Sequence, residues 1–262
     1  MDSSEPAQVE VRDGVAVVTL NRPAALNAVN ADLSRAVGDA VTAAEADPQV
    51  QVIVLTGAGR AFCAGADLKA IGAGLSLHHP GHPEWGFAGF VDRPRQKPAI
   101  AAVNGLARGG GTELMLACDL VVLGEDATVG LPEVRRGLFA AAGGLIELPR
   151  HLPVKLAMEL ALTGSTMDAA TALRWGLANR VAPAGEVLAA ALALAGEISA
   201  NAPLAVRVSR ELVRGAAGAG SPWDAQLHDQ QDRAIQDLLV SDDVREGAAA
   251  FAEKRAPRWS GS

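Results

Sequence analysis

The feature that most constrains the fold is a pair of largely apolar runs, each followed by a glycine-rich turn. Residues 50–56 lead into Gly57-Ala58-Gly59, and residues 100–103 lead into Asn104-Gly105 and then Gly109-Gly110-Gly111. A strand that lacks alternating polar residues is buried on both faces, as in a parallel sheet covered by helices. Aromatic residues make up only 3% of the chain, so Ala, Val, Leu and Gly must build the core. These features predict an α/β fold.

The segments around these runs predict further strands and helices. Asp13-Gly14 is a hairpin turn signal between strands expected at 9–12 and 15–20. A helix is expected over 30–46, because apolar residues recur there at helical spacing behind a capping Asn30. A short helix is expected near Asp67.

The second half of the chain has a different character. A helix at 112–118 and a strand at 119–123 complete the strand–helix units, and the chain after about Leu145 is expected to be all helical. The stretch 71–89 is rich in Gly, His and Pro without a clean period, which indicates a loop. The helices expected in the tail are 153–162, 184–199, 203–214, 223–239 and 242–252.

Charge and composition exclude several classes of protein. The net charge is −7 with scattered basic residues, which disfavours a nucleic-acid partner. No apolar run reaches the roughly 18 residues that a membrane span needs, and the polar N-terminus is unlike a targeting signal. Cys63 and Cys118 lack metal-like spacing and indicate reduced thiols. We therefore expect a cytoplasmic protein without a membrane or nucleic-acid partner.

Two motifs resemble binding sites and fail on their details. The run from Gly57 to Phe62 follows a strand as a dinucleotide-binding turn does, but Phe62 occupies the place of the third glycine. His78, His79 and His82 lie close in sequence, but Pro80-Gly81 interrupts any helix that would align them, and no Cys or carboxylate cluster supports a metal. We expect no metal site.

A third constellation combines a glycine turn with two acidic residues. Gly109-Gly110-Gly111 opens a helix and leaves N–H groups free at its positive end, which suits a developing anion. Glu113 follows in the first turn among apolar neighbours, and Glu133 comes after Pro132 twenty residues later. Each acid alone could be an ordinary helix-start residue; together with the glycines they indicate an acid/base site.

Several spaced motifs resemble the crotonase (enoyl-CoA hydratase/isomerase) superfamily in order and spacing, from about residue 9 to 259. They begin with Asn21-Arg22-Pro23 and Phe62-Cys63-Ala64-Gly65-Ala66-Asp67-Leu68, continue with Asn104-Gly105 and the stretch 109–114, and end with Gly130-Leu131-Pro132-Glu133 and the tail 245–255. The resemblance implies a crotonase-type spiral of ββα units over residues 1–195. It also implies a C-terminal helical trimerisation region over 196–262, and a homotrimer or dimer of trimers.

The resemblance also assigns roles to residues. Glu113 and Glu133 would be catalytic, and the backbone N–H groups of Ala66 and Gly110 would form an oxyanion hole for a CoA thioester. Phe251 and Lys254 would touch the CoA of a neighbouring subunit, where an ammonium suits the 3′-phosphate. The remaining residues expected to bind substrate or CoA are Ala24, Ala25, Leu26, Ala64, Asp67, Leu68, Gly109 and Pro132.

The acidic residues also predict the reaction. Having both glutamates favours an enoyl-CoA hydratase that adds water to a trans-2-enoyl-CoA, or the reverse dehydration, with no cofactor beyond the CoA of the substrate. The residues from Ala140 to Glu147 replace the family's usual Pro-Gly-x-Gly-Gly-Thr-Gln-Arg stretch, and the continuation from Leu148 to Pro153 resembles carnitinyl-CoA dehydratases. That activity, enoyl-CoA isomerisation and non-catalytic binding of a CoA thioester remain as alternatives.

Overall fold

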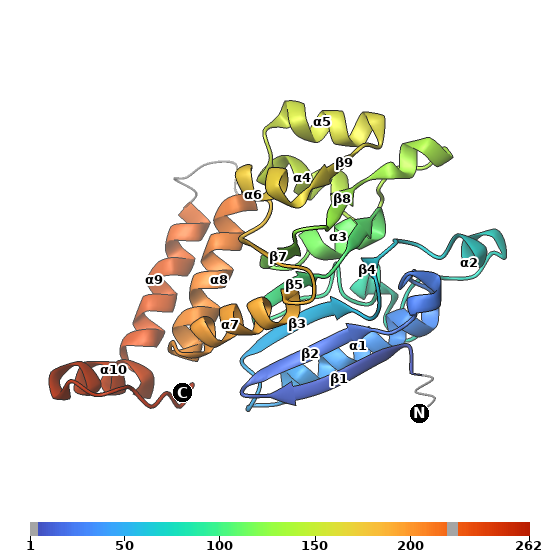
Figure 1. Cartoon of the computed structure of the whole chain (residues 1–262). Coiled ribbons are helices and arrows are strands. Elements are labelled where there is room, and N and C mark those ends of the chain that lie inside the picture. The colour runs from blue at the N-terminus through green and yellow to red at the C-terminus, as the bar shows by residue number, and fades with distance from the viewer. Residues whose placement is uncertain (1–4, 219–224) are drawn as a thin grey trace.

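Two β-sheets form the centre of the computed structural model, which describes residues 5–218 and 225–262 (Figure 1). The first sheet has the order β1 (Ala7–Arg12), β2 (Val15–Leu20), β3 (Val52–Gly57), β5 (Ala99–Val103), β7 (Leu120–Gly124) and β10 (Arg180–Ala182). The second has the order β4 (Ala61–Cys63), β6 (Leu106–Arg108), β8 (Thr128–Gly130) and β9 (Thr166–Asp168). Only the β1–β2 and β8–β9 pairs among these are antiparallel.

From β3 to β8, consecutive strands alternate between the two sheets, and this alternation makes the fold a spiral. β3, β5 and β7 are neighbours in the first sheet, while β4, β6 and β8, which follow them along the chain, lie in the second. A short helix follows each of these strand pairs: α2 (Leu68–Gly72), α3 (Gly110–Leu116) and the 3₁₀ helix η3 (Pro132–Arg136). The predicted α/β spiral of ββα units is therefore confirmed.

Helices cover both faces of the first sheet. Ile53 and Leu55 of β3 join the core under α1 (Ala31–Ala46), whereas Val52 and Val54 face α7 (Val187–Ser199). Because successive strand residues point to opposite faces, a strand buried on both sides must be apolar throughout. The Asn30 side chain accepts a hydrogen bond from the Leu33 N–H at 3.0 Å, which confirms the expected cap of α1.

The tail is not all helical, and the expectation that it would be was wrong. β9 pairs with β8, and β10 pairs with β7, so the chain returns to both sheets after Leu145. Both strands have only three residues, too few to show a period in the sequence. The helices observed are α4 (Gly144–His151), α5 (Val154–Thr163), α6 (Ala169–Arg174), α8 (Pro203–Gly218), α9 (Ala225–Leu239) and α10 (Asp242–Glu253). Residues 223 and 224 of the predicted helix 223–239 lie outside the described residues.

Among the described residues, no single helix is long and apolar enough to cross a membrane. One bent pair, α7 with the segment Pro203–Ala217, meets the length and composition together across a bend of 108°. α7 buries Val187, Ala191 and Ala195 against the first sheet, which is the position of a core helix.

Candidate active site

Glu113 lies in the first turn of α3, and its carboxylate is buried. Every residue of α3 is buried, and only 4% of Glu113 is exposed. Its Oε1 accepts hydrogen bonds from the N–H groups of Ala142 at 2.7 Å and Gly144 at 2.9 Å. The pKa of Glu113 is raised to about 7: burial is the main cause and the nearby Glu133 adds to it, while the two N–H bonds oppose the shift. A carboxyl group with this pKa exchanges protons readily near neutral pH.

Glu133 approaches the same place from η3. Its Oε2 is buried and has no hydrogen-bond partner among the described residues. A β-carbon built on Gly109 would lie 2.6 Å from Glu133 Oε1, so the carboxylate sits against the Gly109 backbone at the start of α3. Burial raises the pKa of Glu133 as well. The structure thus brings the two predicted glutamates to one end of α3.

The two N–H groups predicted to form an oxyanion hole lie beside this pair. β4 pairs with β6, and a β-carbon on Gly65 would lie 3.1 Å from the Gly110 nitrogen, so the segments carrying Ala66 and Gly110 touch. Neither the Ala66 N–H nor the Gly110 N–H donates a hydrogen bond to another residue in the described ranges. Gly109 has φ +53°, which turns the chain from β6 into α3 and favours glycine.

Six of the residues predicted to bind substrate or CoA lie on two segments that contact each other next to Ala66: Ala24, Ala25, Leu26, Ala64, Asp67 and Leu68. Ala24 and Ala25 belong to the 3₁₀ helix η1 (Pro23–Ala25), and the Ala64 N–H donates to the Leu26 carbonyl at 2.9 Å. Asp67 caps α2 and pairs with Arg22 at 3.0 Å, while Leu68 is exposed. These contacts join η1 to the turn that carries the Ala66 N–H.

The Asn27 side chain links the segment after η1 to β4 and to the turn before it. The side chain is fully buried and donates to the carbonyls of Ala58, Ala61 and Phe62 at 3.0, 2.8 and 3.1 Å. Its own Oδ1 accepts from the Arg22 N–H at 2.9 Å. The Asn27 backbone has φ +56°, a conformation that asparagine tolerates better than most residues.

The chain also matches known proteins over nearly its whole length. A family model described as enoyl-CoA hydratase/isomerase matches residues 10–262. The chain belongs to the enoyl-CoA hydratase/isomerase family. It is 39% identical to a carnitinyl-CoA dehydratase of Proteus mirabilis over 98% of this chain and 99% of that protein. It is 42% identical to a mevalonyl-coenzyme A hydratase of Beauveria bassiana, over 95% and 92% of the two proteins.

Solved structures of family members superpose over nearly the whole chain. An enoyl-CoA hydratase from Mycobacterium tuberculosis has a TM-score of 0.92 at 45% identity, covering 98% of this chain and 100% of that one. A carnitinyl-CoA hydratase from Mycobacterium avium has a TM-score of 0.80 at 52% identity, covering 98% and 99%. These relatives confirm the crotonase resemblance and identify the chain as a hydro-lyase of this family.

The structure adds site residues that the sequence did not predict. Ala142 and Gly144 fix Glu113, and they lie in the stretch that departs from the family's usual sequence. A β-carbon on Gly144 would lie 3.0 Å from Glu113 Oε1, which explains why a glycine stands there. Phe87 packs on Gly110, and no periodicity in the sequence indicated this contact.

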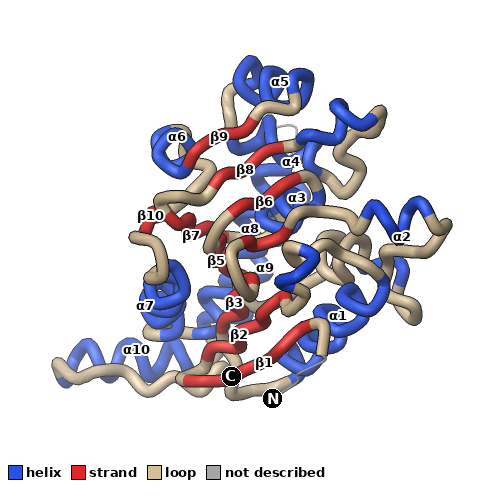
Figure 2. Tube along the Cα trace, turned by 45° about the vertical axis from the view of Figure 1, so that its right-hand side comes forward, coloured by secondary structure: helices blue, strands red, loops and turns tan. Residues whose placement is uncertain are grey.

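Phe251 and Lys254 do not reach the site within one chain. Phe251 is 88% exposed on α10, and Lys254 ends that helix in the left-handed conformation with φ +55°. Figures 1 and 2 place α10 at the far end of the molecule from α3. Their predicted contact with the CoA of a neighbouring subunit stays a prediction. Pro132 begins η3, where it precedes Glu133.

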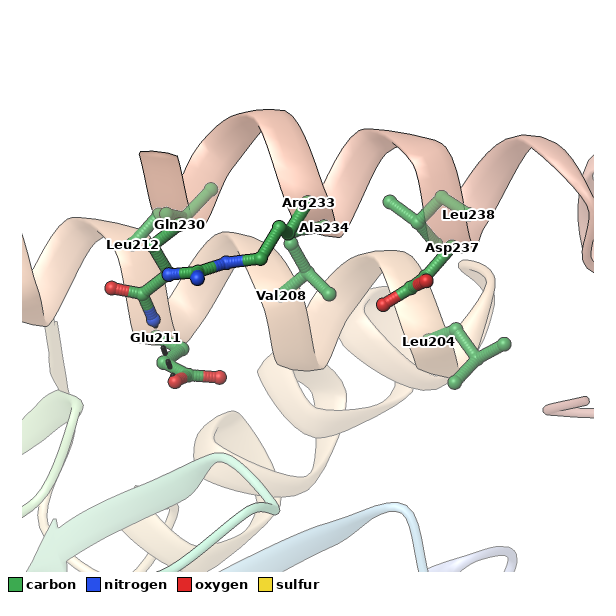
Figure 3. A pocket seen from close by; sticks show the side chains of 9 residues that line it. All are labelled: Leu204, Val208, Glu211, Leu212, Gln230, Arg233, Ala234, Asp237 and Leu238. Carbon is green, nitrogen blue, oxygen red and sulfur yellow. Dashed lines mark hydrogen bonds between the residues drawn. The ribbon is translucent and has the colours of Figure 1, made fainter. Parts of the chain in front are cut away.

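A separate cavity lies between α8 and α9, away from the glutamates (Figure 3). Leu204, Val208 and Leu212 of α8 face Ala234 and Leu238 of α9, and Gln230 donates to Glu211 at 2.7 Å. Part of the apolar stripe on α9 therefore packs within its own chain, whereas Leu239 is 61% exposed. The side chain of Leu227 lies outside the described residues.

Two of the three neighbouring histidines pair with carboxylates. His79 Nε2 lies 3.2 Å from Asp39, and His82 Nδ1 lies 2.9 Å from Glu84. Within 5–218 and 225–262, no group of three or more His, Cys, Asp or Glu residues is arranged to hold a metal ion.

Proposed function

We propose that this protein adds water to the double bond of a trans-2-enoyl-CoA, or removes it from the corresponding 3-hydroxyacyl-CoA. The observation that carries the proposal is the pair Glu113 and Glu133 at the glycine start of α3: Glu113 is buried, Glu133 is half-buried with a buried Oε2, and both have raised pKa values. Hydration needs a base to deprotonate water as it attacks C3 and an acid to protonate C2. Two neighbouring carboxyl groups with raised pKa values can meet both needs.

The hydrogen bonds suggest how the two roles divide. Glu113 Oε1 accepts two N–H donors, which stabilise the ionised form and oppose the rise that burial causes in its pKa, so with a pKa of about 7 the group is partly ionised near neutral pH. Glu113 therefore suits the base that binds and deprotonates water. Glu133 Oε2 is buried without a partner, which favours the protonated form and suits the acid that delivers a proton to C2.

The same site supports stabilisation of the enolate. As water adds, negative charge develops on the thioester oxygen, and the unused N–H groups of Ala66 and Gly110 are available to bind it. Removing one donor of this kind in other enzymes costs about 10²–10³ in rate. Proton transfer and oxyanion binding together complete the reaction, so we propose that it needs no cofactor beyond the CoA of the substrate.

A second candidate substrate is a polar or branched acyl group, as in a carnitinyl-CoA dehydratase. It is favoured by the segment that supplies the Ala142 and Gly144 N–H groups to Glu113, because this segment resembles that subfamily and differs from the usual hydratase sequence. Relatives named carnitinyl-CoA dehydratase and mevalonyl-coenzyme A hydratase are in keeping with it. The reaction type would be the same and only the acyl pocket would differ.

A panel of CoA thioesters tests both candidates. We would incubate the protein with straight-chain trans-2-enoyl-CoAs, crotonobetainyl-CoA and a branched enoyl-CoA, following the loss of the conjugated absorbance and the product mass. Hydration adds the mass of water, isomerisation leaves the mass unchanged, and a non-catalytic binding protein gives neither. Absence of a hydrated product from every thioester, with CoA binding intact, would refute the proposal.

We also propose that residues 196–262 assemble the protein into a homotrimer or a dimer of trimers in the cytoplasm. The proposal is supported by the apolar side chains that α9, α10 and their connection leave exposed: Ile235, Leu239, Val240 and Phe251. Free, buried cysteines suit a reducing compartment. If light scattering finds that the active protein is a monomer, the proposed trimer is refuted.

A further inference from the structure

Phe87 lies directly against the start of α3. A β-carbon built on Gly110 would lie 2.4 Å from Phe87 Cζ and 2.6 Å from Cε1, so the ring occupies the space that a side chain would need. Phe87 itself is 7% exposed. The ring therefore covers the α-carbon next to the Gly110 N–H, which is one of the two donors in the proposed function.

The backbone around Phe87 is tightly folded, although it belongs to the stretch expected to be an irregular loop. Phe87 forms an isolated antiparallel bridge with His78, and its carbonyl accepts from the N–H groups of Phe90 and Val91, each at 3.2 Å. Ala88 has φ +60°, and residues 86–90 are buried. The first part of the loop, by contrast, is exposed, with Leu75 at 63%.

The segment that carries Phe87 packs against α1 at Gly38. Trp85 stacks on His82 at 3.8 Å between ring centroids, and the Arg93 guanidinium lies 3.9 Å from the Trp85 ring. A β-carbon on Gly38 would lie 2.7 Å from the His79 ring and 3.1 Å from Trp85. Glycine is unfavourable inside a helix by about 1 kcal/mol relative to alanine. Gly38 therefore has a packing role: it lets the segment that carries Phe87 approach α1.

We propose that Phe87 is a positioning residue for the reaction: its ring excludes water from the Gly110 N–H and keeps that N–H directed at the thioester oxygen. This inference rests on the proposed function, because it needs an oxyanion at Gly110. A hydrogen bond to a developing charge is stronger in a dry, preorganised site than in one that water can enter. The ring supplies no proton and no hydrogen bond of its own.

The test compares Phe87→Ala and Phe87→Leu with Leu75→Ala, a truncation in the exposed part of the same loop. For the thioester that the wild type hydrates best, F87A should lower kcat by about tenfold or more, because an interaction made mainly in the transition state is weakened. KM should change much less. F87L keeps most of the apolar volume and should lose less, and L75A should match the wild type. F87A kinetics equal to those of L75A would overturn the inference.

Folding and spectroscopy separate the outcomes. If F87A fails to fold, F87L decides: an unchanged kcat overturns the inference, and a reduced kcat at an unchanged melting temperature supports it. With a conjugated dienoyl-CoA as probe, the wild type should shift the absorbance to longer wavelength by polarising the carbonyl. F87A should lose much of that shift. No shift and no hydration with the wild type would defeat the proposed function itself, whereas a full shift with F87A would defeat only the role of Phe87.

Discussion

Replacing Glu113 by glutamine should make the protein more stable at alkaline pH while removing its activity. The amide keeps the shape of the side chain and an oxygen that can accept from the Ala142 and Gly144 N–H groups. It removes the negative charge that burial disfavours, and it also removes the proton that hydration must exchange. Stability and turnover should therefore move in opposite directions.

The size of the stability change follows from the pKa. Burial raises the pKa of Glu113 from 4.5 to about 7, so the fold favours the neutral carboxyl group. This stabilisation is fully present below pH 4.5 and is lost as the pH rises through about 7, because the carboxyl group of the unfolded chain ionises over this range while the buried one stays neutral. Each pKa unit is worth 1.36 kcal/mol, so the wild type should lose roughly 2.5 kcal/mol of stability between pH 5 and pH 8 relative to the glutamine variant.

Urea unfolding at pH 5 and pH 8, at one fixed protein concentration, measures this difference. Taking the change between the two pH values cancels any pH-independent effect of the amide on packing. Glu159→Gln, on the exposed surface of α5, is the matched control and should show no such change. A Glu113→Gln effect that is the same at both pH values would refute the reasoning. Near-normal turnover of the variant would remove Glu113 from the mechanism.

Three further predictions concern Glu133, Lys254 and Asn27. Glu133→Gln should cut kcat by about 10²–10⁴ with CoA affinity retained, since the amide cannot pass a proton; steady-state kinetics and calorimetry with CoA check it. Lys254→Ala should weaken CoA thioesters more than dephospho-CoA thioesters, and equal losses for both would exclude a phosphate contact. Asn27→Ala should lower the free energy of unfolding by about 3 kcal/mol in denaturant titrations, because it leaves buried carbonyls without a donor; a change near zero would show that water replaces the amide.

The sequence alone determined the architecture and the chemical groups of the site. Residues 52–55 and 100–103 are apolar at every position, and only a strand covered on both faces requires that. The glycines before Glu113 predicted free N–H groups at a helix start, and the motif order identified the family. Each of these signals is local, so it survives in the linear order of residues.

Tertiary structure alone decided how the site is assembled. The sequence separates Glu113 from Gly144 by thirty-one residues and Phe87 from Gly110 by twenty-three, and no period or spacing joins either pair. The strands β9 and β10 were missed for the same reason: three residues carry no pattern, and their partners β8 and β7 stabilise them. Contacts between distant segments depend on how the two sheets stack and on which backbones can approach closely. The raised pKa of Glu113, which makes it fit for proton exchange, arises from that burial and from nothing in its sequence neighbours alone.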